Sequence, residues 1–437
     1  MHIVNRSRPH VFFGWWSVIF IGTIAGLGHG FNTYGISVFF KDISEELELN
    51  RAFTSFAAGI GRLEGGITSP LVGWLSDKWG PLWIVISGIF IAGCGMVFMY
   101  FISEVWHYYV AWGVLIGLGL NIGLTLAVDK NINDWFIRRR GLAQGIKFAL
   151  IGVFGIIVLL VVSPLTLSHG WRLTCLVWGI MMFAGIPFAY LLIKPRRPEY
   201  YGLLPDGAEY IPRMETDEMD MIERGVDYAS SLQETEYTFS EARKTLQFWL
   251  MMACFTVQYI IAGGFNLHII PFLTDNWVDE IAAGRMMSMM VFFTVPSRVV
   301  GGILADRIPK NRLQLMLTTA FLLQVIGIGS YLLYPGLPTV YVLLVCHGLS
   351  TGAVTPVVLL ILGRYFGRKA FGSILGMMIA IIAPIGLLAP VYYGWIHDIT
   401  GSYDIAFFTA LIIVFLATAT TYFIRPPGQM KEGKQSW

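Results

Sequence analysis

The sequence predicts an all-α membrane protein in which twelve transmembrane helices form two pseudo-symmetric six-helix bundles. Three observations lead to this fold class. Hydrophobic residues make up 55% of the 437 residues and charged residues only 13%, a balance outside the range of water-soluble domains. Apolar runs recur along the whole chain, and two unrelated motifs of the first half return in the second half.

Each apolar run is long enough to cross a bilayer, whose core of roughly 30 Å takes about 20 helical residues. The expected spans are 14–40, 52–75, 81–101, 106–129, 139–162, 171–193, 246–272, 283–304, 313–334, 338–362, 371–393 and 403–424. We expect no cleavable leader, because the first run is too long and no small-residue cleavage site follows it. The four cysteines lie singly within apolar runs and predict neither a disulfide nor a metal site.

One long polar segment interrupts the pattern between the sixth and seventh spans. It is rich in Pro, Gly and mixed charge, which is typical of a linker, and we expect one surface helix near its end. The sequence therefore divides into an N-terminal six-helix bundle at 1–194, a cytoplasmic linker at 195–245 and a C-terminal six-helix bundle at 246–437.

The basic residues indicate how the chain is oriented. Most of the 30 lysines and arginines fall near the termini, in the linker and in the loops that alternate spans place on the same side. Because positive loops stay inside during insertion, we expect a multi-pass protein of the cell (inner, or cytoplasmic) membrane with both termini cytoplasmic. This topology explains the basic residues, and with a net charge of only +2 we expect no nucleic-acid partner.

Two motif pairs indicate that the halves are copies. "GWLSDKWGP" follows the second span and "GGILADRIPK" the eighth, while "WFIRRRGLAQG" precedes the fifth span and "YFGRKAFGSILG" the eleventh. Asp77 and Asp306 are separated by nearly the same number of residues as Phe136 and Phe366. Such a tandem duplication with parallel halves is typical of transporters whose halves rock about a central site.

The repeated motifs also predict a gate. Carboxylates at helix ends beside basic clusters can bridge neighbouring helices and capture backbone donors, which holds one conformation closed until the contacts break. The expected gating residues are Asp77, Arg138, Arg139, Asp306, Arg307 and Arg368.

These motifs resemble those of a known family. "GWLSDKWGP" resembles the Asp-containing loop motif of the major facilitator superfamily, and "DWFIRRRGLAQGI" resembles the signature of monocarboxylate porters and their oxalate/formate exchanger relatives. "GWW", "YGISVFFKDI" and "RLEGGI" are similar to bacterial members of the same group. The resemblance covers essentially the whole chain and implies a secondary active transporter of small organic carboxylates, such as lactate or pyruvate, that works by rocker-switch alternating access.

Arg298 is the main candidate for binding the substrate. It lies about two helical turns before Asp306, which at about 1.5 Å per residue places it roughly 12 Å from the cytoplasmic edge of the membrane. A cation at that depth must face a wet cavity or a partner, and its planar fork of donors suits a carboxylate. The resemblance implies that Arg298 holds the substrate carboxylate. The alternative is a structural pair with an acid on another helix, such as Glu64.

Lys147 is a second intramembrane cation, at a comparable depth in the other half. The family signature normally has a small residue here, so this lysine is a departure. With Arg298 it would clamp a substrate with two acidic groups, or it would change protonation as the anion enters. A salt bridge to Asp129 or Glu64 is the equally weighted alternative. A third cation, Arg62, is expected to have a structural interhelix role.

Four further residues are expected near the substrate. Asn121 lies mid-span among glycines that permit close helix approach, and related porters have a polar residue near here that hydrogen-bonds the substrate. Tyr34 and His29 of the first span and Tyr259 of the seventh complete the set. The simpler roles are a local hydrogen bond for the histidine and packing for the aromatic rings.

The sequence leaves proton coupling open. Proton-linked animal members carry a lysine in span one and an aspartate one turn before the span-eight arginine, where this chain has Tyr34 and Thr294. We favour symport, because a co-moving proton helps a monoanion to enter against a negative-inside potential. The proton would then use another group, with candidates Lys147, His29, Asp129 and Glu64. Proton-independent exchange of the oxalate/formate type is the alternative.

Other function classes are less well supported. No Walker loop, Gly-x-Ser-x-Gly, His-Glu-x-x-His or Cys-x-x-Cys motif is present, so we expect neither an enzyme nor an ATP-driven pump, and no cofactor or metal. The expected partners are a small organic anion, protons and the lipid bilayer, for a protein that functions as a monomer. Two rivals are a transporter-like anion sensor that signals through the linker and a multidrug exporter.

Overall fold

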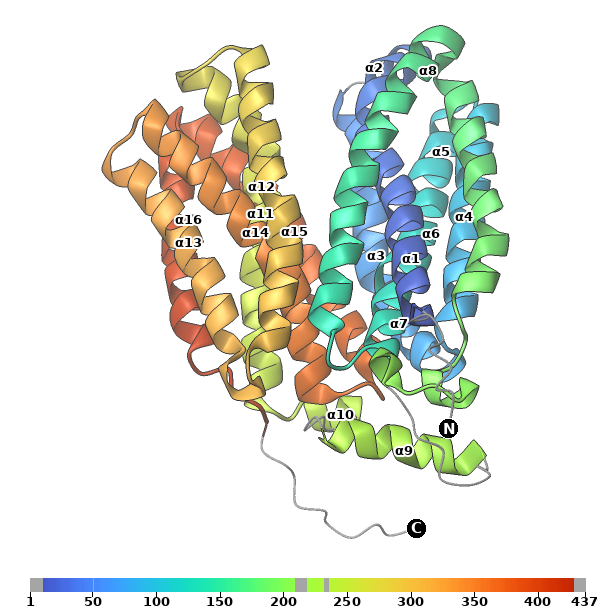
Figure 1. Cartoon of the computed structure of the whole chain (residues 1–437). Helices are drawn as coiled ribbons and strands as arrows, with labels where there is room; N and C mark the ends of the chain where they lie inside the picture. Colours follow the sequence, from blue (N-terminus) through green and yellow to red (C-terminus); the bar gives the residue numbers. More distant parts are fainter. Residues whose placement is uncertain (1–10, 50, 209–217, 232–235, 428–437) are drawn as a thin grey trace, which may run out of the picture.

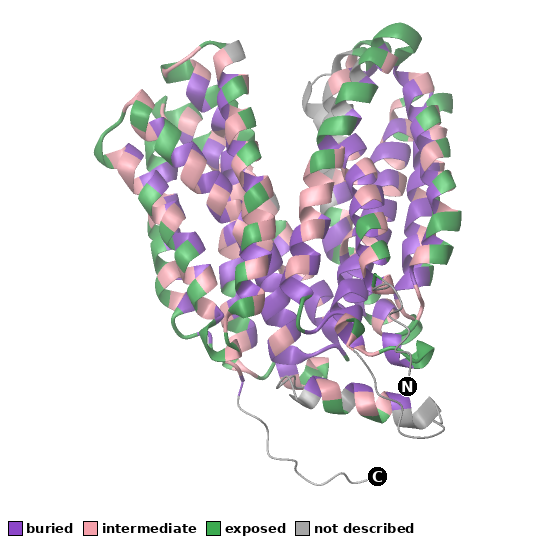
Figure 2. Cartoon of the chain, viewed as in Figure 1, coloured by how far each residue is buried: buried purple, intermediate pink, exposed green. Residues whose placement is uncertain are grey.

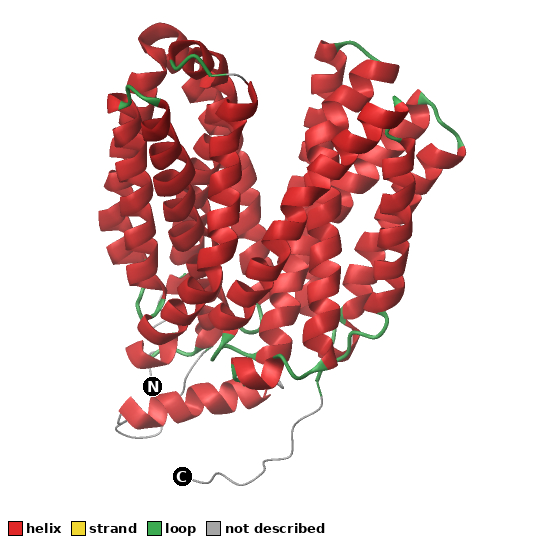
Figure 3. Cartoon of the chain, turned by 180° about the vertical axis from the view of Figure 1, so that it is seen from behind, coloured by secondary structure: helices red, strands yellow, loops and turns green. Residues whose placement is uncertain are grey.

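The computed structural model describes residues 11–49, 51–208, 218–231 and 236–427, and these residues form helices and loops without a strand. Figure 1 shows the long helices in two groups that stand side by side, α1 to α8 in one and α11 to α16 in the other. The two groups converge at the end where the termini, α9 and α10 lie, and they diverge at the opposite end, as the view from behind also shows (Figure 3). The predicted all-α, two-bundle membrane fold is confirmed.

The first group of helices contains the expected spans one to six. Its helices are α1 (Phe13–Gly30), α2 (Ile36–Glu46), α3 (Arg51–Trp79), α4 (Pro81–Phe101), α5 (Val105–Tyr108), α6 (Gly117–Asn121), α7 (Ala127–Trp135) and α8 (Arg140–Leu192). Short π-helical stretches at Phe31–Gly35, Tyr109–Ile116 and Ile122–Leu126 join α1 to α2 and α5 through α7. The helix α8 holds the fifth and sixth expected spans, which meet at Gly170, where φ is +81°. Such a conformation favours glycine and reverses the chain here without a loop.

The linker and the second group follow. The linker contains the 3₁₀ turns Pro198–Tyr201 and Pro205–Gly207 and the helices α9 (Glu218–Ser231) and α10 (Phe239–Ala242). The second group comprises α11 (Leu246–Asn276), α12 (Glu280–Arg307), α13 (Gln314–Leu333), α14 (Leu337–Phe366), α15 (Phe371–Thr400) and α16 (Asp404–Thr421). The helices α11, α12, α14 and α15 extend beyond the expected spans by up to about two turns, because polar turns at the membrane surface continue the helices, whereas α13 and α16 are slightly shorter than expected.

Within the described residues, ten helices or helix segments are long and apolar enough to cross a membrane. They correspond to the third through twelfth expected spans. The first two spans fall outside this set for compositional reasons: α1 is rich in Gly and Trp, and α3 carries charged residues along its length. Charges and small residues lower hydropathy without preventing a helix from packing inside a bundle.

The two groups pack most tightly at the end that carries the linker. Figure 2 shows buried residues concentrated there, whereas exposed and intermediate residues line the facing helices toward the other end. The cross-group contacts are made mainly by α3 with α15 and by α8 with α12. These two pairs are related by the internal duplication, since each joins the second helix of one half to the fifth helix of the other.

Candidate functional site

Asp77, near the end of α3, caps a helix of the other bundle. Its carboxylate accepts hydrogen bonds from the backbone N–H groups of Gly372 (3.1 Å) and Ser373 (2.8 Å) and from the Ser373 hydroxyl (2.6 Å). The first N–H groups of a helix have no partner within it, and that end carries a partial positive charge. Asp77 therefore satisfies the start of α15 across the boundary between the bundles.

Asp306, near the end of α12, makes the reciprocal contact. It accepts hydrogen bonds from the backbone N–H groups of Gly141 and Leu142, both at 2.8 Å, at the start of α8. The Arg364 guanidinium lies 3.7 Å from the same carboxylate. We call the Asp77 and Asp306 contacts the two aspartate caps.

Beside each cap the backbones of the two bundles come into direct contact. A Cβ at Gly73 would lie 2.1 Å from the carbonyl oxygen of Gly372, and a Cβ at Gly302 would lie 2.2 Å from that of Gly141. Any larger residue would push the helices apart, so glycine at these positions allows the aspartates to reach their helix starts.

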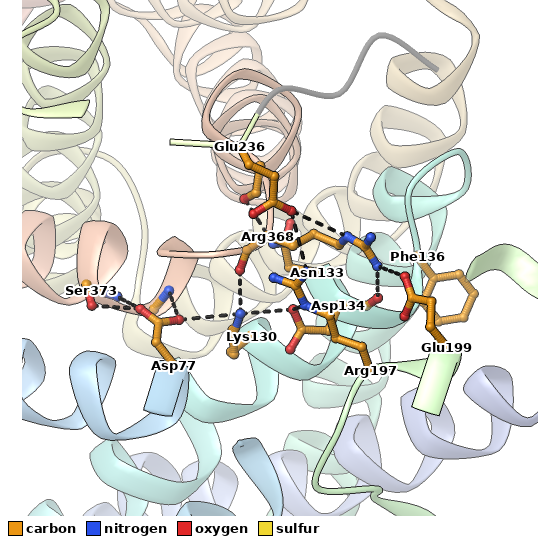
Figure 4. Close-up of polar contacts among 12 residues, drawn as sticks. Asp77, Lys130, Asn133, Asp134, Phe136, Arg197, Glu199, Glu236, Arg368 and Ser373 are labelled. Carbon is orange, nitrogen blue, oxygen red and sulfur yellow. Dashed lines mark hydrogen bonds and ion pairs between the residues drawn. The ribbon is translucent and has the colours of Figure 1, made fainter. Parts of the chain in front are cut away.

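A buried charge network connects the Asp77 cap with the linker (Figure 4). Lys130 of α7 is 3% exposed and lies 3.4 Å from Asp77 and 2.9 Å from Asp134. Its ammonium also donates to the backbone carbonyl of Arg368. Arg368 is 1% exposed and donates to Glu199 at 2.8 Å and to the carbonyl of Asp134 at 3.2 Å. Each of these buried cations thus has a buried acid beside it, as burial of charge requires.

The linker supplies the acid that pairs with Arg368. Glu199 stands on the 3₁₀ turn Pro198–Tyr201 and is 4% exposed. A second linker contact joins the backbone N–H of Tyr237 to the carbonyl of Phe366 at 3.0 Å. The linker is therefore fastened to the loop that precedes α15 in the second bundle.

Asp206 fastens the linker to the first bundle as well. Its carboxylate accepts hydrogen bonds from the backbone N–H groups of Arg138 (2.8 Å) and Arg139 (2.9 Å), just before α8. The hydroxyl of Tyr228 on α9 also donates to Asp206, at 3.2 Å. Burial, the charge of Asp206 and this hydrogen bond raise the pKa of Tyr228 to about 12.

The expected gating residues thus occupy different environments. Asp77 and Asp306 cap helix starts across the boundary between the bundles, and the buried Arg368 pairs with the linker acid Glu199. The side chains of Arg138, Arg139 and Arg307 are exposed, and the first two contribute backbone N–H groups instead.

Sequence reasoning missed Lys130 and Glu199 of the charge network, and it also missed Asp206, which fastens the linker to the first bundle. The sequence does contain one indication for Lys130: Asp134 follows it by four residues, and residues four apart on a helix lie close enough to form an ion pair. Glu199 and Asp206 stand among many charged linker residues, and no local pattern distinguishes a buried acid from a solvated one there.

Arg298 lies where α12 contacts α8, within the membrane-spanning segment Ala282–Arg307. Its guanidinium is half-buried and donates to the backbone carbonyl of Phe148 at 2.8 Å. A Cβ at Gly145 would lie only 2.5 Å from the carbonyl oxygen of Arg298, and one at Gly152 would lie 3.1 Å from its Nη1. Small residues on α8 therefore let the arginine of one bundle reach the backbone of the other.

Lys147 of α8 forms an ion pair with Asp129 of α7, and the two residues are only 2% and 3% exposed. Its ammonium also lies 3.7 Å from the centroid of the Phe148 ring. Of the two pairings left open by the sequence, the one with Asp129 is present. Glu64 lies instead near Gly117, and its Oε2 has no hydrogen-bond partner among the described residues.

Two other expected substrate-site residues, Asn121 and His29, make hydrogen bonds to nearby helices. Asn121 donates to the carbonyls of Gly61 (3.0 Å) and Gly117 (2.9 Å), which ties α6 to α3. His29 Nε2 lies 3.3 Å from the Thr125 hydroxyl. Local hydrogen bonds therefore engage both side chains.

Tyr259 of α11 is 42% exposed and lies beside Gly386 of α15. Tyr34 belongs to the π-helical stretch Phe31–Gly35, but its side chain, like that of Arg62, lies outside the described part of the structure.

Comparison with known proteins places this arrangement in a family. A sequence profile of the Major Facilitator Superfamily matches residues 22–329 and 283–437. The chain belongs to the major facilitator superfamily. It is a multi-pass membrane transporter and not an enzyme.

Within the superfamily the sequence is similar to the monocarboxylate transporters. Monocarboxylate transporter 13 of Rattus norvegicus is 25% identical over 93% of this chain and 88% of its own length. Monocarboxylate transporter 2 of Homo sapiens is 25% identical over 93% of this chain and 84% of its own. The uncharacterized MFS-type transporter YhjX of Escherichia coli K12 is 23% identical over 82% of each chain.

Solved structures share the fold at low sequence identity. The proton:xylose symporter XylE, bound to 6-bromo-6-deoxy-D-glucose, superposes with a TM-score of 0.70 at 16% identity, over 94% of this chain and 96% of its own. FucP, solved in the outward conformation, also gives 0.70, at 12% identity, over 94% of this chain and 98% of its own. The human organic anion transporter MFSD10 gives 0.63 at 12% identity, over 93% and 99%.

Proposed function

We propose that this protein is a secondary active transporter of small organic carboxylates such as lactate or pyruvate, and that it moves them together with protons. It lies in the cell membrane with both termini cytoplasmic and works as a monomer. The observation that carries the proposal is the half-buried Arg298 guanidinium at the contact between the two bundles, within the membrane. Similarity to monocarboxylate transporters supports the carboxylate as the substrate class.

The position of Arg298 suits an anion that must be released on either side. The guanidinium belongs to α12 of one bundle and contacts the α8 backbone of the other. When the bundles rock, the surroundings of the Arg298 guanidinium change. An anion bound to it therefore contacts different groups in the two conformations. A carboxylate accepts two parallel hydrogen bonds from a guanidinium, which is stronger than a single neutral contact.

The contacts at the linker end support the gating half of the proposal. Both aspartate caps and the Arg368–Glu199 pair join elements that must separate before that end can open. With the linker in the cytoplasm, the conformation described here is closed to the cytoplasm. Cytoplasmic release of the substrate then requires these contacts to break, which makes them a gate in the sense of a two-state switch.

Uptake into proteoliposomes tests the substrate assignment. Arg298→Ala is expected to lower saturable uptake of labelled lactate and pyruvate by at least about a hundredfold, because a charge-assisted pair is lost. Arg285→Ala is the matched control, since Arg285 is an exposed arginine on the same helix. Undiminished uptake by purified, folded Arg298→Ala protein contradicts the assignment.

A pH gradient tests the coupling. Symport predicts that an inward proton gradient drives lactate above its external concentration and that a protonophore abolishes this accumulation. Transport that proceeds only against a preloaded anion, indifferent to the gradient, identifies an exchanger. High-affinity binding without any flux supports the anion-sensor alternative.

A further inference from the structure

The buried pair of Lys147 and Asp129 lies beside the proposed substrate site without being part of it. Both residues belong to the first bundle and are almost fully buried. The Lys147 ammonium packs on the ring of Phe148, and the carbonyl of that same residue accepts the hydrogen bond from Arg298. One residue of α8 therefore contacts the cations of both bundles.

This placement makes the charge of Lys147 relevant to any anion at Arg298. Lys147 and Arg298 interact electrostatically, and the acid bonded to Lys147 is Asp129. Other polar groups near the pair are His29 of α1, Gln144 of α8 and Tyr259 of α11. A contact ion pair has little net charge at a distance, so Asp129 largely cancels the attraction that Lys147 would exert on an anion.

We propose that Asp129 sets the charge class of the transported anion. By holding and neutralising Lys147 it leaves a single guanidinium to face the substrate, which matches a monocarboxylate and disfavours a dicarboxylate. Without the Asp129 charge, Lys147 would have no counter-ion, and the second carboxylate of a dianion at Arg298 would take that place and keep the lysine protonated. The protein would then distinguish monocarboxylates from dicarboxylates in two ways: Arg298 attracts the first carboxylate, and the negative charge of Asp129 disfavours a second one. The inference rests on the function proposed above.

The test is competition for lactate uptake in proteoliposomes near neutral pH, where lactate carries one negative charge and malonate two. For the wild type, unlabelled lactate is expected to compete well and malonate poorly. For Asp129→Asn, the ratio of malonate to lactate affinity is expected to rise by about tenfold or more, because one cation is unmasked at short range. The double variant Asp129→Asn, Lys147→Gln removes that cation and is expected to return the ratio to the wild-type value.

Two further variants separate charge from structure. Asp404→Asn is the matched control, because Asp404 lies at the start of α16 in the other bundle and accepts a hydrogen bond from Tyr331. Lys147→Gln leaves Asp129 without its cation, so malonate affinity is expected to fall more than lactate affinity. This second variant carries the test if Asp129→Asn does not fold.

The outcomes are distinct. An unchanged malonate-to-lactate ratio in folded Asp129→Asn protein overturns the inference, as does a shift that persists in the double variant. Binding of neither acid by folded Asp129→Asn protein, measured by thermal stabilisation, also overturns it, since the pair would then be purely structural. If the wild type transports neither acid, the proposed function itself fails; lactate transport with an unaltered ratio refutes only the role of Asp129.

Discussion

The ion pair between Arg368 and Glu199 offers a quantitative test of how the linker stabilises the closed state. Replacing Glu199 with Gln removes the negative charge while keeping an oxygen that can accept the hydrogen bond from Arg368. Breaking a buried pair outright costs about 3–5 kcal/mol. Arg368 keeps its bond to the Asp134 carbonyl at 3.2 Å, and Glu236 lies 4.0 Å away. We therefore expect the smaller cost of weakening a charged hydrogen bond, about 1.5–3 kcal/mol.

If this free energy belongs to the closed conformation alone, the ratio of closed to open protein falls by about tenfold to a hundredfold. A cysteine introduced at Ser69 can report the change. Ser69 is 5% exposed, and its carbonyl oxygen lies only 2.3 Å from where a Cβ of Gly376 would stand on α15. Separation of α3 from α15 should uncover the thiol. In a background without the native cysteines, Glu199→Gln should raise the maleimide labelling rate at least about tenfold.

The control is Glu241→Gln, because Glu241 is another linker acid but is only partly buried and caps the short helix α10. It should leave the labelling rate of the Ser69 cysteine unchanged. Equal labelling of Glu199→Gln and wild-type protein would refute the reasoning, since the ion pair would then contribute equally to both conformations.

Three further predictions concern the contacts at the same end. Asp306→Asn and Asp77→Asn should each weaken the closed state by about 0.5–2 kcal/mol through loss of a charged helix cap, seen as faster labelling of the same cysteine. Gly302→Ala should lower the melting temperature or favour the open state, because its Cβ would lie 2.2 Å from the Gly141 carbonyl, whereas Gly284→Ala on the same helix meets nothing within 4 Å and should be neutral. Tyr228→Phe should cost about 0.5–1.5 kcal/mol of linker docking through loss of the Asp206 hydrogen bond, measured as faster proteolysis within the linker.

The fold could be predicted from sequence because its determinants are local. Apolar runs of bilayer length and the repeated aspartate motifs are visible without knowing which helices touch. The division between spans five and six was less accurate, since the expected loop is helical up to Gly170 and the chain turns at that residue. At this point a single residue with positive φ reverses the direction of the chain, whereas a polar loop does so between other spans.

The site was less predictable because its contacts join distant segments. The motif of Asp77 indicated a gate, but its partners Gly372 and Ser373 are identified only by the packing of α3 on α15. The partner of Lys147 could be either of two acids until the helices were placed, and it is Asp129. The acidic linker residue Glu199 looks like any solvated charge until Arg368 is found buried against it.

The reciprocity of the two aspartate caps has a consequence for the route between conformations. Each bundle contributes one capping carboxylate and also the helix start that the other carboxylate caps. Because the backbones are in close contact at the glycines beside each cap, one cap cannot open while the other stays closed. A half-released intermediate would lose one cap while straining the other, so both should let go in a single concerted step. The two duplicated caps therefore act as one cooperative gate, which is either fully closed or fully open.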